Sequence, residues 1–411
     1  MMIITNIKLL VNVRTHNELL RGKALAELPV IENAYLIIKE DLIVEYGPMN
    51  NLKHPVSDFK THMDASGQMI LPAWCDSHTH LVFPASREEE FVDKIKGVSY
   101  AEIAAKGGGI LNSARKLADT SEDALFNDAW KRLEEISKLG TGAIEIKSGY
   151  GLTVEGELKM LRVIKKLKER SSLSIKATFL GAHTFPLQYK ENHAAYIDSL
   201  IHEILPVIAK ENLADYIDVF CETGFYNPEE TEKICRAGMA HGLKPKIHAN
   251  QLNLSGGTEI GVKLGAVSVD HLETMDENSI RILANSNTIG TLLPTAAFFL
   301  RMPFQPARQL IDAGCAIALA TDYNPGSSPS GNMSLVVSMS CIQMKMLPEE
   351  AINAATINGA YAMELENELG SITVGKKANL IFTKPIPSIA YLPYAFGSNL
   401  IDQVMIAGNI I

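Results

Sequence analysis

Between Met69 and Met346, apolar runs of strand length alternate with amphipathic segments of helical length. This alternation is typical of βα units, in which parallel strands are buried on both faces by helices. Strands are expected in QMILPAWCDSHTH, GTGAIEIKSGYG, SIKATFLGAHTF, ADYIDVFCETGFY, LKPKIHANQ, GAVSVDHLE, NTIGTLLPT and AIALATDYNPG. Eight such runs predict an α/β fold, a (β/α)8 TIM barrel, which typically takes about 250 residues.

The segments between these runs carry helix-start signals. Thr120 with Asp123 fits a capping box at the beginning of one helix. Asn227 followed by Pro228 is typical of the first residues of another. Both signals indicate helices that cover the predicted sheet.

Segments rich in β-forming residues flank the predicted barrel on both sides. The chain begins with runs such as IITNIKLLVNV and AYLIIKEDLIVEYG, and it ends with GSITVGKKANLIFTKP and VMIAGNII. The simplest architecture pairs the two termini in one small β-sandwich beside the barrel. We therefore expect residues 1–66 and 363–411 to form the sandwich and residues 67–362 to form the barrel.

Charge and composition exclude several classes of partner. The net charge of −9, without a Lys/Arg-rich stretch, argues against nucleic acid. No apolar run reaches the roughly 18–20 residues of a membrane span, and the first residues lack the features of a signal peptide. Five scattered cysteines without a CxxC pair indicate reduced thiols in a cytoplasmic protein. An exposed flank of the predicted barrel favours a homodimer.

Histidines gather at the ends of the predicted strands. Active sites of such barrels lie at the C-terminal ends of the strands. The polar residues at these ends are His78, His80, Tyr150, His183, His248, His271 and Asp322, which include five of the 11 histidines. Each of them alone is explained by local structure, but together they indicate one site. Imidazole and carboxylate groups suit Zn²⁺ or iron better than Ca²⁺ or Mg²⁺.

The chain resembles the amidohydrolase superfamily, which holds its metal with HxH on the first strand, His on the fifth and Asp on the eighth. The resemblance covers essentially the whole chain, including ATINGAYAM and LGSITVGKKANLIFTK near its end. It implies the metal ligands His78, His80, His248 and Asp322. Dinuclear members usually carry a bridging Lys at the end of the fourth strand, where this chain has Glu222. The resemblance therefore implies one Zn²⁺ or Fe ion per chain, and Lys147 is interpreted as structural.

Five motifs narrow the resemblance: EIKSGYGL, GAHTFP, IHANQLN, SVDHLE and ATDYNPGSSP. They are similar to those of members that hydrolyse the cyclic amide of 4-imidazolone-5-propanoate to N-formimidoyl-L-glutamate in histidine degradation. The resemblance implies that Asp322 and His271 move protons and that His183 polarises the carbonyl. It also implies a substrate-binding set of Arg87, Tyr150, His183, Gln251, Asn324, Gly326 and Ser327.

Two of these residues need separate consideration. Arg87 suits a bidentate contact with the propanoate, but a local ion pair with Glu90 at i+3 is an alternative. Gln251 stands where many members carry Glu, and an amide cannot act as a base. The proton transfers then fall to Asp322 and His271, whose division of roles the sequence leaves open.

Two other functions remain as alternatives. A mononuclear deaminase of guanine or a related heterocycle uses the same kinds of ligand, although Arg87, Gln251 and SGYGL favour an acidic imidazolone. A catalytically inactive scaffold of this fold would typically have lost metal ligands, and all four candidates are present. Tyr100 and the glycine-rich AKGGGI (105–110) are expected to form a loop over the site.

Overall fold

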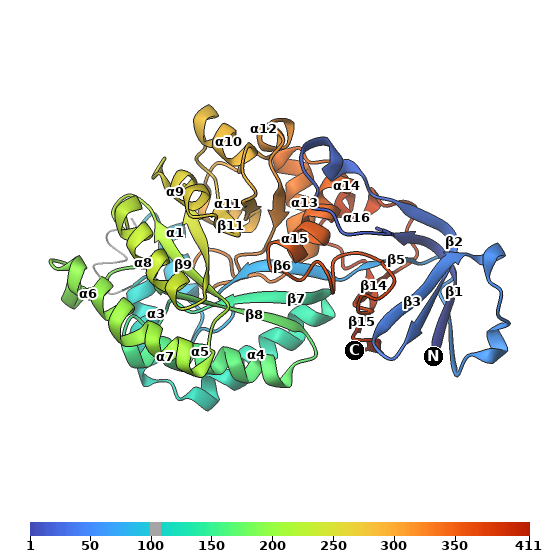
Figure 1. The fold of residues 1–411 in the computed structure, drawn as a ribbon, viewed down its shortest axis with the longest axis horizontal. Helices are drawn as coiled ribbons and strands as arrows, with labels where there is room; N and C mark the ends of the chain where they lie inside the picture. Colours follow the sequence, from blue (N-terminus) through green and yellow to red (C-terminus); the bar gives the residue numbers. More distant parts are fainter. Residues whose placement is uncertain (99–107) are drawn as a thin grey trace.

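The computed structural model describes residues 1–98 and 108–411. In these ranges the strands form two sheets, a barrel and a second sheet that contains both chain termini (Figure 1). Tyr100 and residues 105–107, expected over the site, lie outside the described ranges.

The barrel consists of parallel strands that follow one another around the sheet in chain order. They are β6 (Trp74–Thr79), β7 (Thr141–Lys147), β8 (Ser174–Ala182), β9 (Tyr216–Cys221), β10 (Lys244–Ala249), β11 (Ser268–His271), β12 (Ile289–Leu292) and β13 (Ile317–Leu319). The segment after β13 returns to β6, where Thr79 forms a parallel bridge with Tyr323. The predicted (β/α)8 fold is confirmed.

Helices follow the barrel strands and cover the outside of the barrel (Figure 1). They are α1 (Glu88–Ile95), α3 (Ile110–Asp119), α4 (Glu122–Lys138), α5 (Val154–Arg170), α6 (His193–Ser199), α7 (Leu205–Glu211), α8 (Pro228–Ala240), α9 (Gly257–Lys263), α10 (Glu277–Ala284), α11 (Pro294–Leu300), α12 (Ala307–Asp312) and α13 (Met333–Met344). Asn227 caps α8 as predicted, in a capping box with Glu230. The predicted cap of α4 was wrong. Ser121 caps that helix, and the Thr120 hydroxyl donates to the carbonyl of Lys116 at the end of α3.

Both ends of the chain contribute to the second sheet, which lies at the right of Figure 1. Its strands run in the order β16-β15-β14-β5-β1-β2-β3, and β4 also pairs with β1. Their bounds are β1 (Met2–Val11), β2 (Val30–Lys39), β3 (Leu42–Pro48), β4 (Thr61–Asp64), β5 (Met69–Pro72), β14 (Leu380–Thr383), β15 (Ile401–Ile406) and β16 (Asn409–Ile410). The run expected as the first barrel strand therefore divides at Ala73, between β5 in this sheet and β6 in the barrel.

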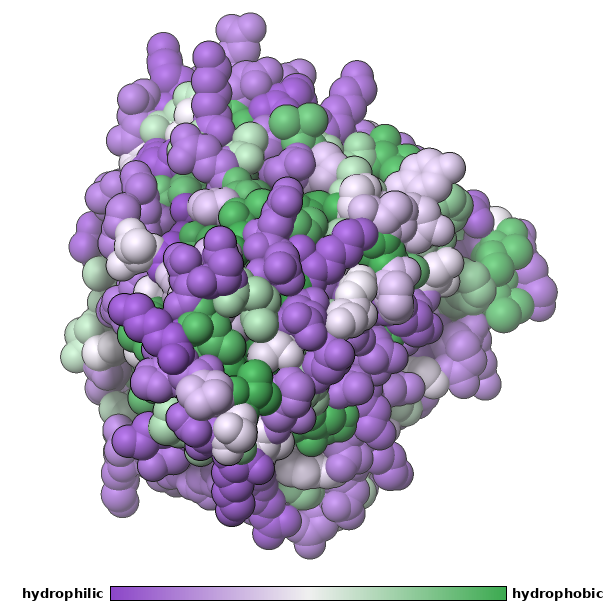
Figure 2. All heavy atoms as spheres, turned by 90° about the vertical axis from the view of Figure 1, so that its right-hand side faces the viewer, coloured by the Kyte–Doolittle hydropathy of each residue, from purple (hydrophilic) through white to green (hydrophobic). Residues whose placement is uncertain are grey.

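A separate apolar core holds the terminal sheet together. Buried side chains from the two ends of the chain meet in it, among them Ile4, Leu36, Ile70, Leu380 and Phe382. The helices α14 (Pro348–Ala355) and α15 (Ile357–Tyr361) lead from the barrel towards β14. The face of the molecule on this side is mostly hydrophilic and carries separate apolar patches (Figure 2). Within the described ranges, no helix combines the length and the apolar character needed to cross a membrane.

Candidate active site

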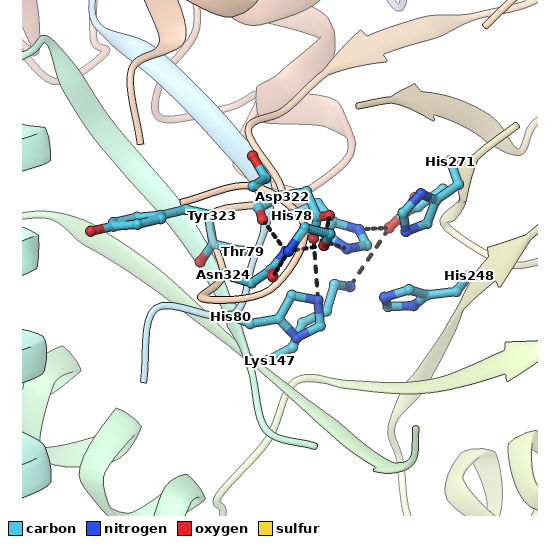
Figure 3. Close-up of polar contacts among 12 residues, drawn as sticks. His78, Thr79, His80, Lys147, His248, His271, Asp322, Tyr323 and Asn324 are labelled. Atoms are coloured by element: carbon cyan, nitrogen blue, oxygen red, sulfur yellow. Dashed lines mark hydrogen bonds and ion pairs between the residues drawn. The ribbon is translucent and has the colours of Figure 1, made fainter. Parts of the chain in front are cut away.

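Four imidazoles and one carboxylate converge at the C-terminal ends of the barrel strands (Figure 3). The Nε2 atoms of His78 and His80 each lie 3.5 Å from Oδ1 of Asp322. The ring of His248 lies 4.5 Å from that of His78 and 5.3 Å from that of His271, centroid to centroid. Donor atoms lie within 4.8 Å of one another in two groups, His78–His80–Asp322 and His78–His248–His271.

The histidine donor atoms fit a bound metal. Nδ1 of His78 lies 2.6 Å from Asp270 Oδ2, and Nδ1 of His248 lies 2.9 Å from Asp218 Oδ2. The Nε2 atoms of both rings are buried without a hydrogen-bond partner among the described residues. Burial lowers the pKa of His78, which favours the neutral imidazole that a metal requires. Carboxylates behind histidine ligands commonly fix the ring in this way, so the donor set suits Zn²⁺ or Fe.

A buried lysine connects the two carboxylates behind these histidines. Nζ of Lys147 lies 2.8 Å from Asp218 Oδ2, 3.6 Å from Asp270 Oδ2 and 2.6 Å from Glu145 Oε1. All four side chains are fully buried. Asp218 and Asp270 were not predicted from the sequence as site residues. The sequence signal for them is an Asp inside an apolar strand, as in YIDVF and SVDH. Such an Asp indicates a polar network, because a buried carboxylate needs partners.

The backbone is strained where His271 and Asp322 enter the site. The φ angle of His271 is 87° and that of Asp322 is 53°. Leu272, which directly follows His271, has a φ of 65°. Non-glycine residues seldom adopt such values, which cluster at functional sites. Nδ1 of His271 faces Glu273 Oε1 at 3.3 Å. Burial acts to lower the pKa of His271, but neighbouring carboxylates, Glu273 first, reverse the effect and raise this pKa.

A cavity of about 1010 Å³ opens above the histidine cluster. Its walls include all the expected site residues except the fully buried His78: His80, Arg87, Tyr150, His183, His248, Gln251, His271, Asp322, Asn324, Gly326 and Ser327. The structure thus brings together residues from positions 78 to 327 of the chain. It adds Lys94 and Phe91 from α1, and Phe298, Phe299, Arg301 and Met302 from α11 and the segment after it. None of these residues follows the end of a barrel strand directly, so the pattern of polar residues at strand ends did not predict them.

Arg87 faces the cavity and also forms the ion pair considered as the alternative. Its Nε and Nη2 lie 2.9 and 2.6 Å from Glu90 Oε2. The other oxygen of Glu90 accepts the N–H of Gly109 at 3.0 Å. A Cβ at Gly326 would lie 2.2 Å from Nη1 of Arg87, so the glycine leaves room for the guanidinium. The two interpretations of Arg87 are therefore compatible.

Asn324 shapes the loop that follows the last barrel strand. Its Oδ1 accepts the N–H groups of Gly326 and Ser327, both at 2.8 Å. Its Nδ2 donates to the carbonyl of Asp322 at 2.6 Å, and the Ser327 hydroxyl reaches Asp322 Oδ2 at 3.3 Å. This loop holds the carboxylate of Asp322 next to the wall that contains Gly326 and Arg87.

Comparisons with known proteins identify the family of the chain. The model of the amidohydrolase family matches residues 177–411. The imidazolonepropionase of Flavobacterium johnsoniae is 60% identical over 410 residues, covering 100% of this chain and 99% of that protein. That of Christiangramia forsetii is 55% identical over 411 residues, covering 100% of both. The chain belongs to the amidohydrolase family. Within that family its full-length similarity is to the imidazolonepropionases, and it is a hydrolase of carbon–nitrogen bonds.

Solved structures share the fold at low sequence identity. A zinc-bound adenosine deaminase from Xanthomonas campestris has a TM-score of 0.70 and 17% identity, covering 100% of this chain and 92% of that one. A 5-methylcytosine deaminase from Klebsiella pneumoniae has a TM-score of 0.73 and 14% identity, with 100% and 97% covered. Similarity at this level concerns the fold and not the substrate.

Proposed function

We propose that the cavity binds 4-imidazolone-5-propanoate and that the site hydrolyses its cyclic amide bond, giving N-formimidoyl-L-glutamate in histidine degradation. One observation carries this proposal: the Arg87 guanidinium and the His/Asp cluster face the same cavity. A substrate with a carboxylate at one end and a cyclic amide at the other would be matched at both ends. The full-length similarity to imidazolonepropionases supports the same substrate.

We assign the ligands of one Zn²⁺ or Fe ion to His78, His80, His248 and Asp322. The unpartnered Nε2 atoms and the carboxylates behind His78 and His248 support this set. When bound, such an ion supplies a water nucleophile at neutral pH and polarises a carbonyl oxygen. His271 is left outside the ligand set, with Nδ1 engaged by Glu273 and its other ring nitrogen available to the cavity.

Asp322 and His271 carry the protons in this proposal. Both line the cavity, and Gln251 beside them has no basic group. One of the two accepts a proton from the attacking water, and the other delivers a proton to the departing ring nitrogen. The Ser327 hydroxyl, 3.3 Å from Asp322 Oδ2, steadies the carboxylate for this work.

The geometry around His183 changes the role that we propose for it. Nδ1 of His183 lies 3.0 Å from the carbonyl oxygen of Gly149. A carbonyl only accepts, so Nδ1 carries a proton, and the neutral ring then has an acceptor at Nε2. Burial lowers the pKa of His183 to about 3, which keeps the ring neutral. We therefore propose that His183 accepts an N–H of the imidazolone ring, in place of the carbonyl-polarising role expected from the sequence.

The test is an assay of purified protein together with elemental analysis. We expect about one equivalent of Zn or Fe per chain and hydrolysis of 4-imidazolone-5-propanoate. Guanine and related heterocycles serve as the alternative substrates. Deamination of one of these heterocycles, with no turnover of the imidazolone, would reject the proposal.

We also propose a cytoplasmic location and a homodimer. All five cysteines lie within the described ranges and are free thiols, which suits a reducing compartment. Exposed apolar side chains near α13 and α16 (Tyr391–Tyr394) suit contact with a second copy: Ile342, Leu347, Tyr394 and Phe396. The mass in solution, measured by light scattering, tests the dimer.

A further inference from the structure

A fully buried carboxylate lies behind the cavity wall and has no part in the mechanism above. Glu157, in the first turns of α5, accepts the N–H groups of Gly149, Gly151 and Leu152 at 3.1, 2.7 and 3.1 Å. The Ser148 hydroxyl also hydrogen-bonds to this carboxylate. The loop of residues 148–152, which has the sequence SGYGL, is thus wrapped around a single side chain.

The sequence of this loop permits the wrapped conformation. Gly149 has a φ of 115° and Leu152 a φ of 52°, both in the left-handed region. A Cβ at Gly151 would lie 2.1 Å from the backbone nitrogen of Glu157. A left-handed non-glycine residue such as Leu152 costs of order 1–3 kcal/mol. Hydrogen bonds to a buried charged group offset a cost of that size, so the carboxylate is what stabilises this loop.

The other side of the loop faces the cavity. The carbonyl of Gly149 receives the Nδ1 proton of His183 at 3.0 Å, which determines the tautomer of that ring. The Tyr150 ring lies 5.6 Å from the ring of His183 and 5.9 Å from that of His80, centroid to centroid. Glu157 itself is not among the described residues that line the cavity. Any effect on the substrate must therefore pass through the loop.

We propose that Glu157 is a positioning residue, which sets the orientation and tautomer of His183 and the place of Tyr150 by holding loop 148–152. The kinetic test of this proposal rests on the function proposed above, whereas the loop contacts do not depend on that function.

The kinetic test is a double-mutant cycle between Glu157→Gln and His183→Asn. The Gln variant keeps the size of the side chain but replaces one acceptor oxygen with an NH₂ group. We expect it to lower kcat/KM for 4-imidazolone-5-propanoate by about 10- to 100-fold in the native background, as for a lost hydrogen bond to a charged group. In the His183→Asn background the same change should cost less than about threefold, because His183 is absent and only the place of Tyr150 is still affected.

Glu222→Gln is the matched control. This buried carboxylate also accepts backbone N–H groups, from Leu252 at 2.8 Å and Asn253 at 3.3 Å. It holds a different loop, so its effect should be the same factor with and without His183. If Glu157→Gln also gives the same factor in both backgrounds, or leaves kcat/KM at the native value, the proposal is overturned.

A second measurement needs no substrate. In the native protein, the amide protons of Gly149, Gly151 and Leu152 should exchange slowly, and NMR should show a protected Nδ1–H signal for His183. Glu157→Gln should speed the exchange and shift or remove that signal, whether or not the imidazolone is the substrate. Rapid exchange of these amides in the native protein would overturn the proposal, even if the variant failed to fold. Lack of native turnover alone would reject the proposed function and not the loop contacts.

Discussion

Replacing Arg87 with Met tests whether the cavity recognises a carboxylate. Met keeps most of the apolar stem and removes the charge. In the native protein Nε and Nη2 of Arg87 are engaged by Glu90, while Nη1 lies against Gly326 on the cavity wall. The guanidinium can therefore contact a substrate without giving up its ion pair.

The expected loss follows from the burial of the guanidinium. The Arg87 side chain is 10% exposed, so solvent and salt screen its interactions weakly. Losing a hydrogen bond to a charged group costs about 1.5–3 kcal/mol. Since about 1.4 kcal/mol corresponds to a factor of ten, kcat/KM for 4-imidazolone-5-propanoate should fall by roughly 10- to 150-fold. Metal content should stay at the native value, because Arg87 is not a proposed ligand.

Two controls separate recognition from loop structure. Arg87→Met leaves Glu90 without its cation, although Glu90 still accepts N–H groups from Gly109 and Asn112. The double variant Arg87→Met/Glu90→Gln removes the uncompensated charge and should remain as impaired as the single variant. An imidazolone without the carboxylate should be a poor substrate for the native protein and no worse for the variant.

Either of two results would refute the reasoning on Arg87. An equal loss for both substrates would mean that Arg87 organises the loop and that the carboxylate binds elsewhere. Recovery of native kcat/KM in the double variant would mean that the unpaired Glu90, and not the missing guanidinium, caused the defect.

Three further predictions concern the metal site. His248→Ala should abolish metal binding and activity together and leave a folded barrel by circular dichroism; full metal content would show that the ligand set is wrong. His271→Ala should keep most of its metal and lose turnover by about 10²–10⁴-fold, the usual range for a general acid or base; metal loss would place His271 among the ligands. Lys147→Met should lower the unfolding free energy of the metal-free protein by about 3–5 kcal/mol in urea titrations, because Asp218 and Asp270 lose a buried partner; an unchanged unfolding free energy would contradict this account of the network.

The periodicity of the chain determined the barrel, and the order of its strands then predicted which residues meet. Parallel strands gather their C-terminal ends at one rim, so His78, His183 and His271 can be expected together from their places after apolar runs alone. The resemblance to the amidohydrolases relied on motifs at those same ends. Local signals at helix ends were less decisive. Asn227 was correctly predicted as the cap of α8, but Thr120 was predicted as the cap of α4, where the structure has Ser121.

Contacts between strands that are distant in the sequence were decided only by the tertiary structure. Lys147 on β7 meets Asp218 on β9 and Asp270 on β11, and no local pattern indicates which buried charges will pair. The direction in which His183 presents its lone pair depends on the carbonyl of Gly149, 34 positions away along the chain. Hydropathy and spacing indicate which residues are buried and on which face of a strand they lie. The partner of a buried polar atom depends instead on how the strands are arranged around the barrel.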